Sequence, residues 1–333
     1  MAKEIIRFPL HVLGWAFGLV GIAALTLTAM IAAPLGHLPE LTSISQSARA
    51  VDRSSMPPLS RFSARDGTEL AYRHYPARGP SRGKVAIVVH GSSGSSVAVH
   101  ALADALAARG VETYAPDMRG HGGSGSRGDI GFIGQLENDM ADLVAVVRKA
   151  SPSEPLTLIG HSSGGGFALR VAGSSIQDLF SRTVLLAPYL GYDAPSTRAD
   201  SGGWAKPDLP RFFGLTALAK LGIDCCEGLP TLAFAVPANS ERILNPTYSY
   251  RLMRNFATRG YQQDFAAARH PMTLMAGASD ELMLAGKYAD AVHAASPSTE
   301  VKLIDGVDHM GIVCNARGVA AVADDVANAR TGS

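Results

Sequence analysis

The sequence predicts an α/β fold, a mostly parallel sheet flanked by helices, with an inserted helical cap and an N-terminal transmembrane helix. Three observations carry this prediction. Short β-branched runs alternate with amphipathic helical patterns over most of the chain, as they do in parallel sheets. The alternation stops between Tyr189 and Arg269, a stretch rich in Leu, Phe and Pro that is too long for a structureless loop. Near the N-terminus, Leu10 to Ala33 holds 24 residues without Asp, Glu, Lys or Arg.

The N-terminal apolar stretch is long enough to cross a membrane. As a helix it reaches about 36 Å, against about 30 Å for a hydrocarbon core. A cleaved signal peptide has an apolar stretch of only about 7–15 residues followed by a small-x-small site, and the best match here, Ala48-Arg49-Ala50, lies far downstream. A buried core helix seldom runs so long without a charge. We expect residues 1–34 to anchor the chain, with Lys3 and Arg7 keeping the N-terminus in the cytoplasm and the rest outside it.

The remaining elements follow in order. Residues 35–60 are expected to be a linker, because they are rich in Pro and Ser and suit a loop that need not pack. The main domain, 61–333, begins with a hairpin whose Asp66-Gly67 turn lies between Phe62 and the run Leu70-Ala71-Tyr72. Buried strands are then expected at 84–89, 111–115, 156–159, 183–187, 273–276 and 301–304. Helices lie between most of them, one follows Asn315, and the cap covers about 189–269.

Composition excludes several classes of protein. Lys and Arg number 30 against 29 Asp and Glu, so the net charge of +1 argues against a nucleic-acid binder. A hydrophobic share of 47% with 18% charged residues excludes a disordered chain. Three Cys are too few for a disulfide scaffold. The composition therefore predicts a globular domain that contacts neither DNA nor RNA.

A candidate nucleophile lies between an expected strand and an expected helix. Gly160-His161-Ser162-Ser163-Gly164 has the pattern G-x-S-x-G in strand–turn–helix context. A nucleophile on such a sharp turn has a strained backbone, and glycine at the flanking positions avoids clashes with the strand and the helix. The helix that starts behind Ser162 also favours developing negative charge. Ser162, which the glycines flank symmetrically, is the expected nucleophile rather than Ser163.

Three motifs together resemble a known family. They are His90-Gly91-Ser92-Ser93-Gly94, Asp117-Met118-Arg119-Gly120-His121-Gly122-Gly123-Ser124 and Gly160 to Gly165. They resemble the α/β-hydrolase superfamily, and within it the branch of monoacylglycerol lipases, lysophospholipases and the serine aminopeptidase domain. The resemblance covers about 61–327, with the cap unmatched in detail.

The resemblance implies an acid and a base that follow the serine. Gly277-Ala278-Ser279-Asp280 is similar to the family's acid motif, which maps to Asp280, and the motif that carries the base maps to His309. Both residues follow expected strands, at the sheet edge where ligands bind in open α/β folds. Glu281 and Asp308 are alternative orienting carboxylates, although Asp308 cannot easily reach the ring of its own sequence neighbour.

The resemblance also implies two backbone N–H groups, those of Ser92 and Ser163, as an oxyanion hole. His90 is then expected to shape the oxyanion loop. His121 and His161 are expected to be structural. No His, Cys and Asp cluster has metal-ligand spacing, so neither a metal nor another cofactor is expected.

The expected function is hydrolysis of a lipid-like carboxylic ester, such as a monoacylglycerol or lysophospholipid, through an acyl-enzyme on Ser162. The same triad permits acyl transfer, thioester hydrolysis or aminopeptidase activity, and a catalytically silent binding module is a further alternative. An aminopeptidase needs a carboxylate for the substrate's ammonium, and the cap offers Glu227 and Glu241. The oligomeric state is left open.

The cap and the cysteines each allow two interpretations. The cap's apolar residues suit an acyl chain, but they suit the cap's own core better; they are Phe212, Phe213, Leu215, Leu218, Leu221, Leu232 and Phe234. Outside the cytoplasm, Cys225 or Cys226 could bond Cys314. Three free thiols are slightly favoured, because adjacent cysteines with an odd total are not a scaffold pattern.

Overall fold

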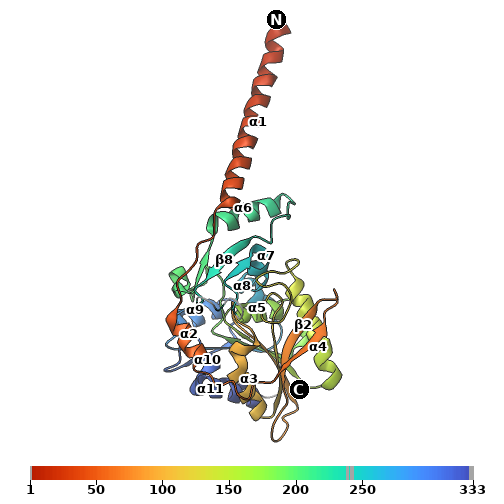
Figure 1. Cartoon of the computed structure of the whole chain (residues 1–333), viewed down its shortest axis with the longest axis vertical. Coiled ribbons are helices and arrows are strands. Elements are labelled where there is room, and N and C mark those ends of the chain that lie inside the picture. Colours follow the sequence, from red (N-terminus) through yellow and green to blue (C-terminus); the bar gives the residue numbers. More distant parts are fainter. Residues whose placement is uncertain (1, 238–239, 241–243, 330–333) are drawn as a thin grey trace.

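The computed structural model describes residues 2–237, 240 and 244–329. Figure 1 shows a rounded body from which one long N-terminal helix projects. Eight strands form the main sheet, in the order β1-β2-β4-β3-β5-β6-β10-β11. They are β1 (Leu59–Ser63), β2 (Glu69–Tyr75), β3 (Lys84–Val89), β4 (Val111–Pro116), β5 (Leu156–His161), β6 (Arg182–Leu186), β10 (Met272–Gly277) and β11 (Glu300–Ile304).

The sheet is mostly parallel, which confirms the fold class. β4, β3, β5, β6, β10 and β11 pair in parallel, whereas β2 runs opposite to its neighbours β1 and β4. The predicted hairpin joins β1 and β2, and Gly67 has the positive φ of 81° that its turn requires. β3 and β5 are almost wholly buried, so helices must cover both faces of the sheet.

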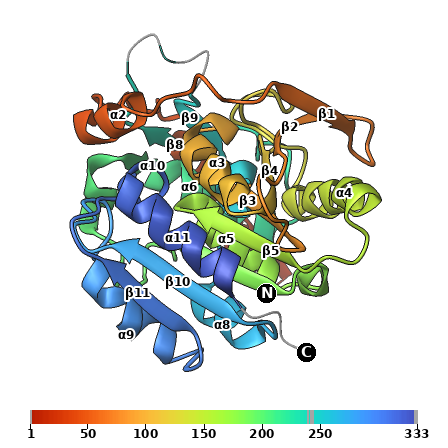
Figure 2. The same ribbon diagram turned by 90° about the horizontal axis from the view of Figure 1, so that it is seen from below.

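Two groups of helices provide that cover (Figure 2). α3 packs against α11, whereas α5 packs against α8 and is joined to α4 by an Arg170–Glu137 ion pair. α9 and α10 follow the last two strands of the parallel part. The bounds of these helices are α3 His100–Ala108, α4 Gln135–Ala150, α5 Ser163–Ala172, α8 Tyr261–Ala267, α9 Tyr288–His293, α10 Gly311–Cys314 and α11 Ala316–Asn328.

The insertion after β6 differs from the purely helical cap that the sequence predicts. It contains helices α6 (Leu209–Lys220) and α7 (Tyr250–Asn255), but also an antiparallel sheet of β7 (Ala205–Pro207), β8 (Pro230–Phe234) and β9 (Thr247–Ser249). These strands are only three to five residues long. Runs this short have too little alternation to be distinguished from loop or helix by sequence pattern.

The N-terminal helix α1 (Ala2–Ala32) contains a candidate membrane span, Val12–Ala32, with a mean hydropathy of 2.0 and no buried side chain. The hydroxyls of Thr26 and Thr28 donate to carbonyls one turn earlier, at 2.9 Å each, so these polar groups are satisfied within the helix. At its C-terminal end α1 packs against α6, where Arg211 Nε donates to the carbonyl of Ile31 at 2.8 Å.

The expected linker does not behave as a loop throughout. Thr42–Arg49 forms a helix, α2, in which Ile44 and Ser45 are buried. The expectation that this whole segment need not pack is therefore wrong. Proline and serine content described the flanking residues but carried no information about the distant surface on which α2 lies.

Candidate functional site

Ser162 lies on a sharp turn between β5 and α5. Its backbone has φ 54° and ψ −120°, which is strained for a residue with a side chain. The flanking glycines are needed at this turn. A Cβ on Gly160 would lie 2.1 Å from the carbonyl oxygen of Gly164, and a Cβ on Gly164 would lie 2.2 Å from the carbonyl oxygen of His90. The sequence-based expectation of a strained, glycine-flanked turn is confirmed.

The structure brings His309 and Asp280 together. Nδ1 of His309 lies 2.8 Å from Oδ2 of Asp280, although the two residues follow different strands, β11 and β10. Because a carboxylate only accepts, Nδ1 carries the proton and Nε2 is left as the acceptor of the imidazole. This is the tautomer that a general base needs if it is to take a proton through Nε2.

The Asp280 carboxylate is held in its ionised form. Its second oxygen, Oδ1, accepts from the backbone N–H groups of Leu282 at 2.9 Å and Met283 at 2.8 Å. Burial alone would raise the pKa of Asp280, but the charge and hydrogen bond of His309 and these two N–H groups outweigh it and lower the pKa.

The two alternative carboxylates have other partners. Glu281 Oε2 accepts from the backbone N–H of His309 at 3.0 Å, and Asp308 Oδ1 accepts from the N–H of Gly311 at 2.5 Å. Both therefore shape the loop around His309. Among the three candidates, Asp280 is the carboxylate that contacts the imidazole.

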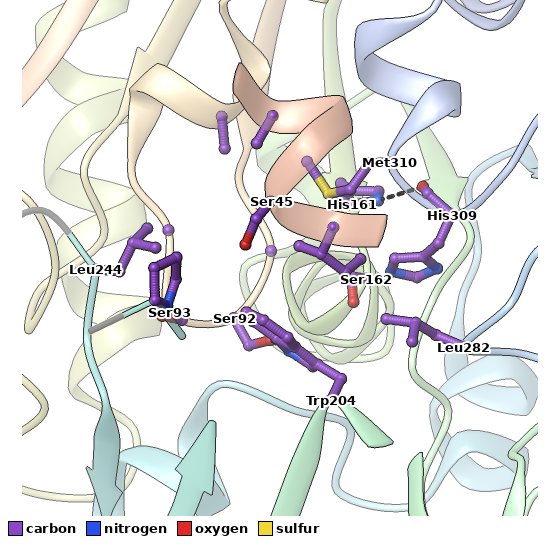
Figure 3. A pocket seen from close by; sticks show the side chains of 16 residues that line it. Ser45, Ser92, Ser93, His161, Ser162, Trp204, Leu244, Leu282, His309 and Met310 are labelled. Carbon is purple, nitrogen blue, oxygen red and sulfur yellow. Dashed lines mark hydrogen bonds between the residues drawn. The ribbon is translucent and has the colours of Figure 1, made fainter. Parts of the chain in front are cut away.

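Ser162 and His309 line one pocket at the carboxyl edge of the sheet. Figure 3 shows the Ser162 hydroxyl and the His309 ring beside each other. Most of the lining is apolar, and no Asp or Glu of the described residues belongs to it. The lining consists of Ile44, Ser45, Ala48, Gly91, Ser92, Ser93, Gly94, Ala98, His161, Ser162, Trp204, Pro237, Leu244, Leu282, His309 and Met310.

The two expected oxyanion donors, Ser92 and Ser163, lie in segments beside the nucleophile turn. Ser163 begins α5, so its backbone N–H belongs to the first helical turn, where no carbonyl of the helix can accept it. Gly91 brings the loop of Ser92 against the nucleophile turn, since a Cβ on Gly91 would lie 3.2 Å from Cβ of Ser162. Within the described part of the chain, neither N–H donates to a protein acceptor.

Two buried histidines, His90 and His161, support the backbone around Ser162, and His161 also lines the pocket. His90 Nε2 accepts from the N–H of Met118 at 3.1 Å, so its Nδ1–H donates to the carbonyl of Gly91 at 2.7 Å. His161 donates to the carbonyl of His309 at 3.1 Å. Burial, and to a lesser extent the nearby His309, lowers the pKa of His161 to about 3. Neutral imidazoles thus fix the backbone on both sides of Ser162.

Two cap residues that the sequence did not point to, Tyr248 and Trp204, hydrogen-bond to the loop of Ser92 and Ser93. The hydroxyl of Tyr248 accepts from the N–H of Ser93 at 2.7 Å and donates to Nε2 of His121 at 2.5 Å. The indole N–H of Trp204 donates to Oγ of Ser92 at 2.8 Å. No motif surrounds either aromatic residue, so only the three-dimensional arrangement reveals them.

Other sequence candidates lie away from the pocket. Leu215 and Phe234 are buried in the cap, while Phe213 and Leu221 are exposed, and none of the cap's seven apolar candidates lines the pocket. Glu227 does not line it either, and Glu241 lies outside the described residues. All three cysteines are free thiols.

Comparisons with known proteins bear on the family and the fold of the chain. A family model described as serine aminopeptidase, S33, matches residues 79–313. An uncharacterised protein of Mycobacterium tuberculosis is 26% identical over 277 residues, which is 77% of each chain. The structure of a soluble variant of Saccharomyces cerevisiae monoglyceride lipase aligns with a TM-score of 0.59 at 19% identity, covering 83% of this chain and 95% of that one. A bacterial membrane phospholipase A aligns with a TM-score of 0.56 at 15% identity, covering 99% of this chain and 100% of that one.

Proposed function

Because the chain belongs to the serine aminopeptidase (S33) family of α/β hydrolases, we propose that it is a serine hydrolase that cleaves carboxylic esters of lipids. Ser162 is the nucleophile, His309 the general base and Asp280 the residue that orients His309. The observation that carries the proposal is the 2.8 Å contact between His309 and Asp280 beside an apolar pocket that Ser162 also lines.

The reaction follows from the placement of these groups. Nε2 of His309 accepts the hydroxyl proton of Ser162 as its oxygen bonds to the acyl carbon, and Asp280 stabilises the imidazolium that forms. The carbonyl oxygen becomes an anion, which the N–H groups of Ser92 and Ser163 receive, each worth about 3–4 kcal/mol of barrier. His309 returns the proton to the leaving alcohol as the tetrahedral carbon collapses to the acyl-enzyme. Water, deprotonated by His309, then releases the acid and restores Ser162.

A lipid substrate is supported by the pocket and by the relatives. Most of the lining is apolar, and no described acidic side chain is there to hold the ammonium of a peptide substrate. Two of the aligned structures are named a monoglyceride lipase and a membrane phospholipase A. We therefore favour monoacylglycerols and phospholipids over peptides.

We further propose that α1 anchors the enzyme in a membrane with the catalytic domain outside the cytoplasm. The apolar span Val12–Ala32 supports anchoring, and Lys3 and Arg7 on the short tail support this orientation. The likeness to the membrane phospholipase extends over 99% of the chain and so includes the N-terminal segment.

A fluorophosphonate probe on the full-length protein in detergent tests the chemistry. We expect labelling of the wild type and none of Ser162→Ala. Ser163→Ala, which keeps the backbone N–H and changes a neighbouring hydroxyl, is the matched control and should still be labelled. Hydrolysis of monoacylglycerol, lysophospholipid, diacyl phospholipid and aminoacyl substrates then identifies the preferred bond. Labelling that persists in Ser162→Ala would reject the assignment.

Membrane fractionation tests the anchor. The full-length chain should resist extraction by carbonate, and a chain without residues 2–33 should not. A phosphatase reporter fused after Ser333 should be active only where the C-terminus lies outside the cytoplasm. If a reporter that is active only in the cytoplasm were active at that position, the catalytic domain would lie in the cytoplasm and the proposed orientation would be wrong.

A further inference from the structure

The segment between the membrane helix and the first strand forms part of the pocket that contains Ser162. Ile44, Ser45 and Ala48 of α2 line that pocket together with Ser162 and His309. Ile44 is 9% exposed and Ser45 7%, whereas Ser43 and Gln46 on the same helix are exposed. One side of α2 therefore faces the site and the other faces solvent.

Contacts at two places hold α2 over the pocket. Before the helix, the N–H of Leu41 donates to the carbonyl of Ala235, which follows cap strand β8. Within it, the hydroxyl of Ser47 donates to Oδ2 of Asp308 at 3.4 Å, one residue before His309. α2 thus contacts both the cap and the loop that carries His309.

α2 and the cap enclose the Ser162 hydroxyl between them. Figure 3 shows α2 on one side of this hydroxyl and the Trp204 ring on the other. The Trp204 ring is itself held by its hydrogen bond to Ser92. The α2 side chains Ile44 and Ala48 are apolar, as are Met310 and Leu282 elsewhere in the lining. An acyl chain bonded to Ser162 would find apolar contacts on the α2 side.

We propose that α2 is the wall of the acyl site, and that the size of the side chain at position 44 sets the longest acyl chain that the enzyme accepts. This inference rests on the proposed ester hydrolysis for its substrate class. Ile44 is the largest of the three α2 side chains in the pocket, so it removes the most space from an acyl chain. The segment that contains α2 therefore determines the acyl-chain specificity of the enzyme and also connects α1 to the catalytic domain.

The test is a chain-length series on the full-length protein in detergent. p-Nitrophenyl esters from acetate to laurate are compared for the wild type, Ile44→Ala, Ile44→Trp and the matched control Gln46→Ala. Each methylene newly buried is worth about fourfold, so Ile44→Ala should raise the ratio of kcat/KM for long over short esters on the order of tenfold. Ile44→Trp should lower that ratio by a similar factor, and Gln46→Ala should leave it unchanged.

A second readout does not require turnover. Trp204 lines the pocket, and Trp15 is the other tryptophan of the chain. In a Trp15→Phe, Ser162→Ala background, Trp204 fluorescence reports the binding of saturated fatty acids of increasing length. Adding Ile44→Ala should tighten the binding of long fatty acids relative to short ones on the order of tenfold.

The outcomes separate this inference from the proposed function. A uniform loss of kcat/KM at every chain length in Ile44→Ala means that Ile44 only stabilises the fold, and it overturns the inference. So do ratios that match those of Gln46→Ala in both assays. If the wild type hydrolyses no ester but fatty-acid binding follows residue 44, the proposed function fails and the acyl wall stands.

Discussion

Asp280 accepts a 2.8 Å hydrogen bond from Nδ1 of His309, and neither side chain is more than 2% exposed. The other oxygen of the same carboxylate accepts two backbone N–H groups. The carboxylate therefore cannot turn away from the imidazole without losing bonds that water cannot replace in a buried site.

Asp280→Asn should lower kcat for ester hydrolysis by about 10³–10⁴-fold with little change in thermal stability, because the amide can donate to Nδ1 and favour the wrong tautomer. Glu281→Gln is the matched control, since Glu281 accepts the backbone N–H of His309 at 3.0 Å, whereas Asp280 contacts the imidazole. It should retain most activity. Steady-state kinetics and a melting curve check both variants, and a larger loss in Glu281→Gln than in Asp280→Asn would reassign the orienting carboxylate.

Gly164→Ala should destabilise the fold by about 3 kcal/mol or more, because the new methyl would lie 2.2 Å from the carbonyl oxygen of His90 and the backbone must shift. Gly286→Ala is the control, since no atom of the described residues lies within 4 Å of the Cβ it would add. Chemical denaturation monitored by fluorescence measures the difference. Equal stability of the two variants would contradict the close packing of the nucleophile turn.

Arg119→Met should lower the free energy of unfolding by about 3–5 kcal/mol. Arg119 and Asp139 form a bidentate pair with two 2.7 Å bonds, and both side chains are 7% exposed, so the variant leaves a buried carboxylate without its partner. Arg269→Met removes a pair with Asp178 whose side chains are 61% and 65% exposed, and should cost far less stability because solvent screens an exposed pair. Denaturation midpoints compare the two, and similar losses would be inconsistent with this account.

Stability should fall as the pH is lowered from about 7 towards 4. Burial lowers the pKa of His90, His121 and His161, so each stays neutral in the folded protein while the unfolded chain binds a proton below about 6.5. Unfolding then takes up protons, which favours the unfolded state at lower pH. Melting temperatures across this range measure the slope. His121→Gln should reduce the number of protons taken up on unfolding by about one, which makes the dependence of stability on pH shallower. An unchanged dependence would show that His121 titrates alike in the folded and unfolded states.

Sequence patterns predicted the strands of the main sheet and the sharp turn at Ser162, and the resemblance to a family pointed to Asp280 and His309. Lys84–Val89 and Leu156–Ile159 are mostly apolar runs. Their local composition predicts both that they form strands and that these strands are buried. A side chain at Gly160 would collide with Gly164, which is close in sequence, whereas a side chain at Gly164 would collide with the distant His90. The catalytic role of Ser162, Asp280 and His309 remains a prediction for the experiments above.

The tertiary structure decided what surrounds those residues. The hydroxyl of Ser47 bonds to Asp308 across 261 positions of the chain, and Tyr248 bonds to Ser93 across 155. No local pattern encodes such a partner, because a serine in a Pro-rich segment looks the same whether it faces solvent or a pocket. Local sequence thus determined where strands and sharp turns form, since these depend on neighbouring residues. The walls of the pocket were decided by packing between segments that only the folded chain brings together.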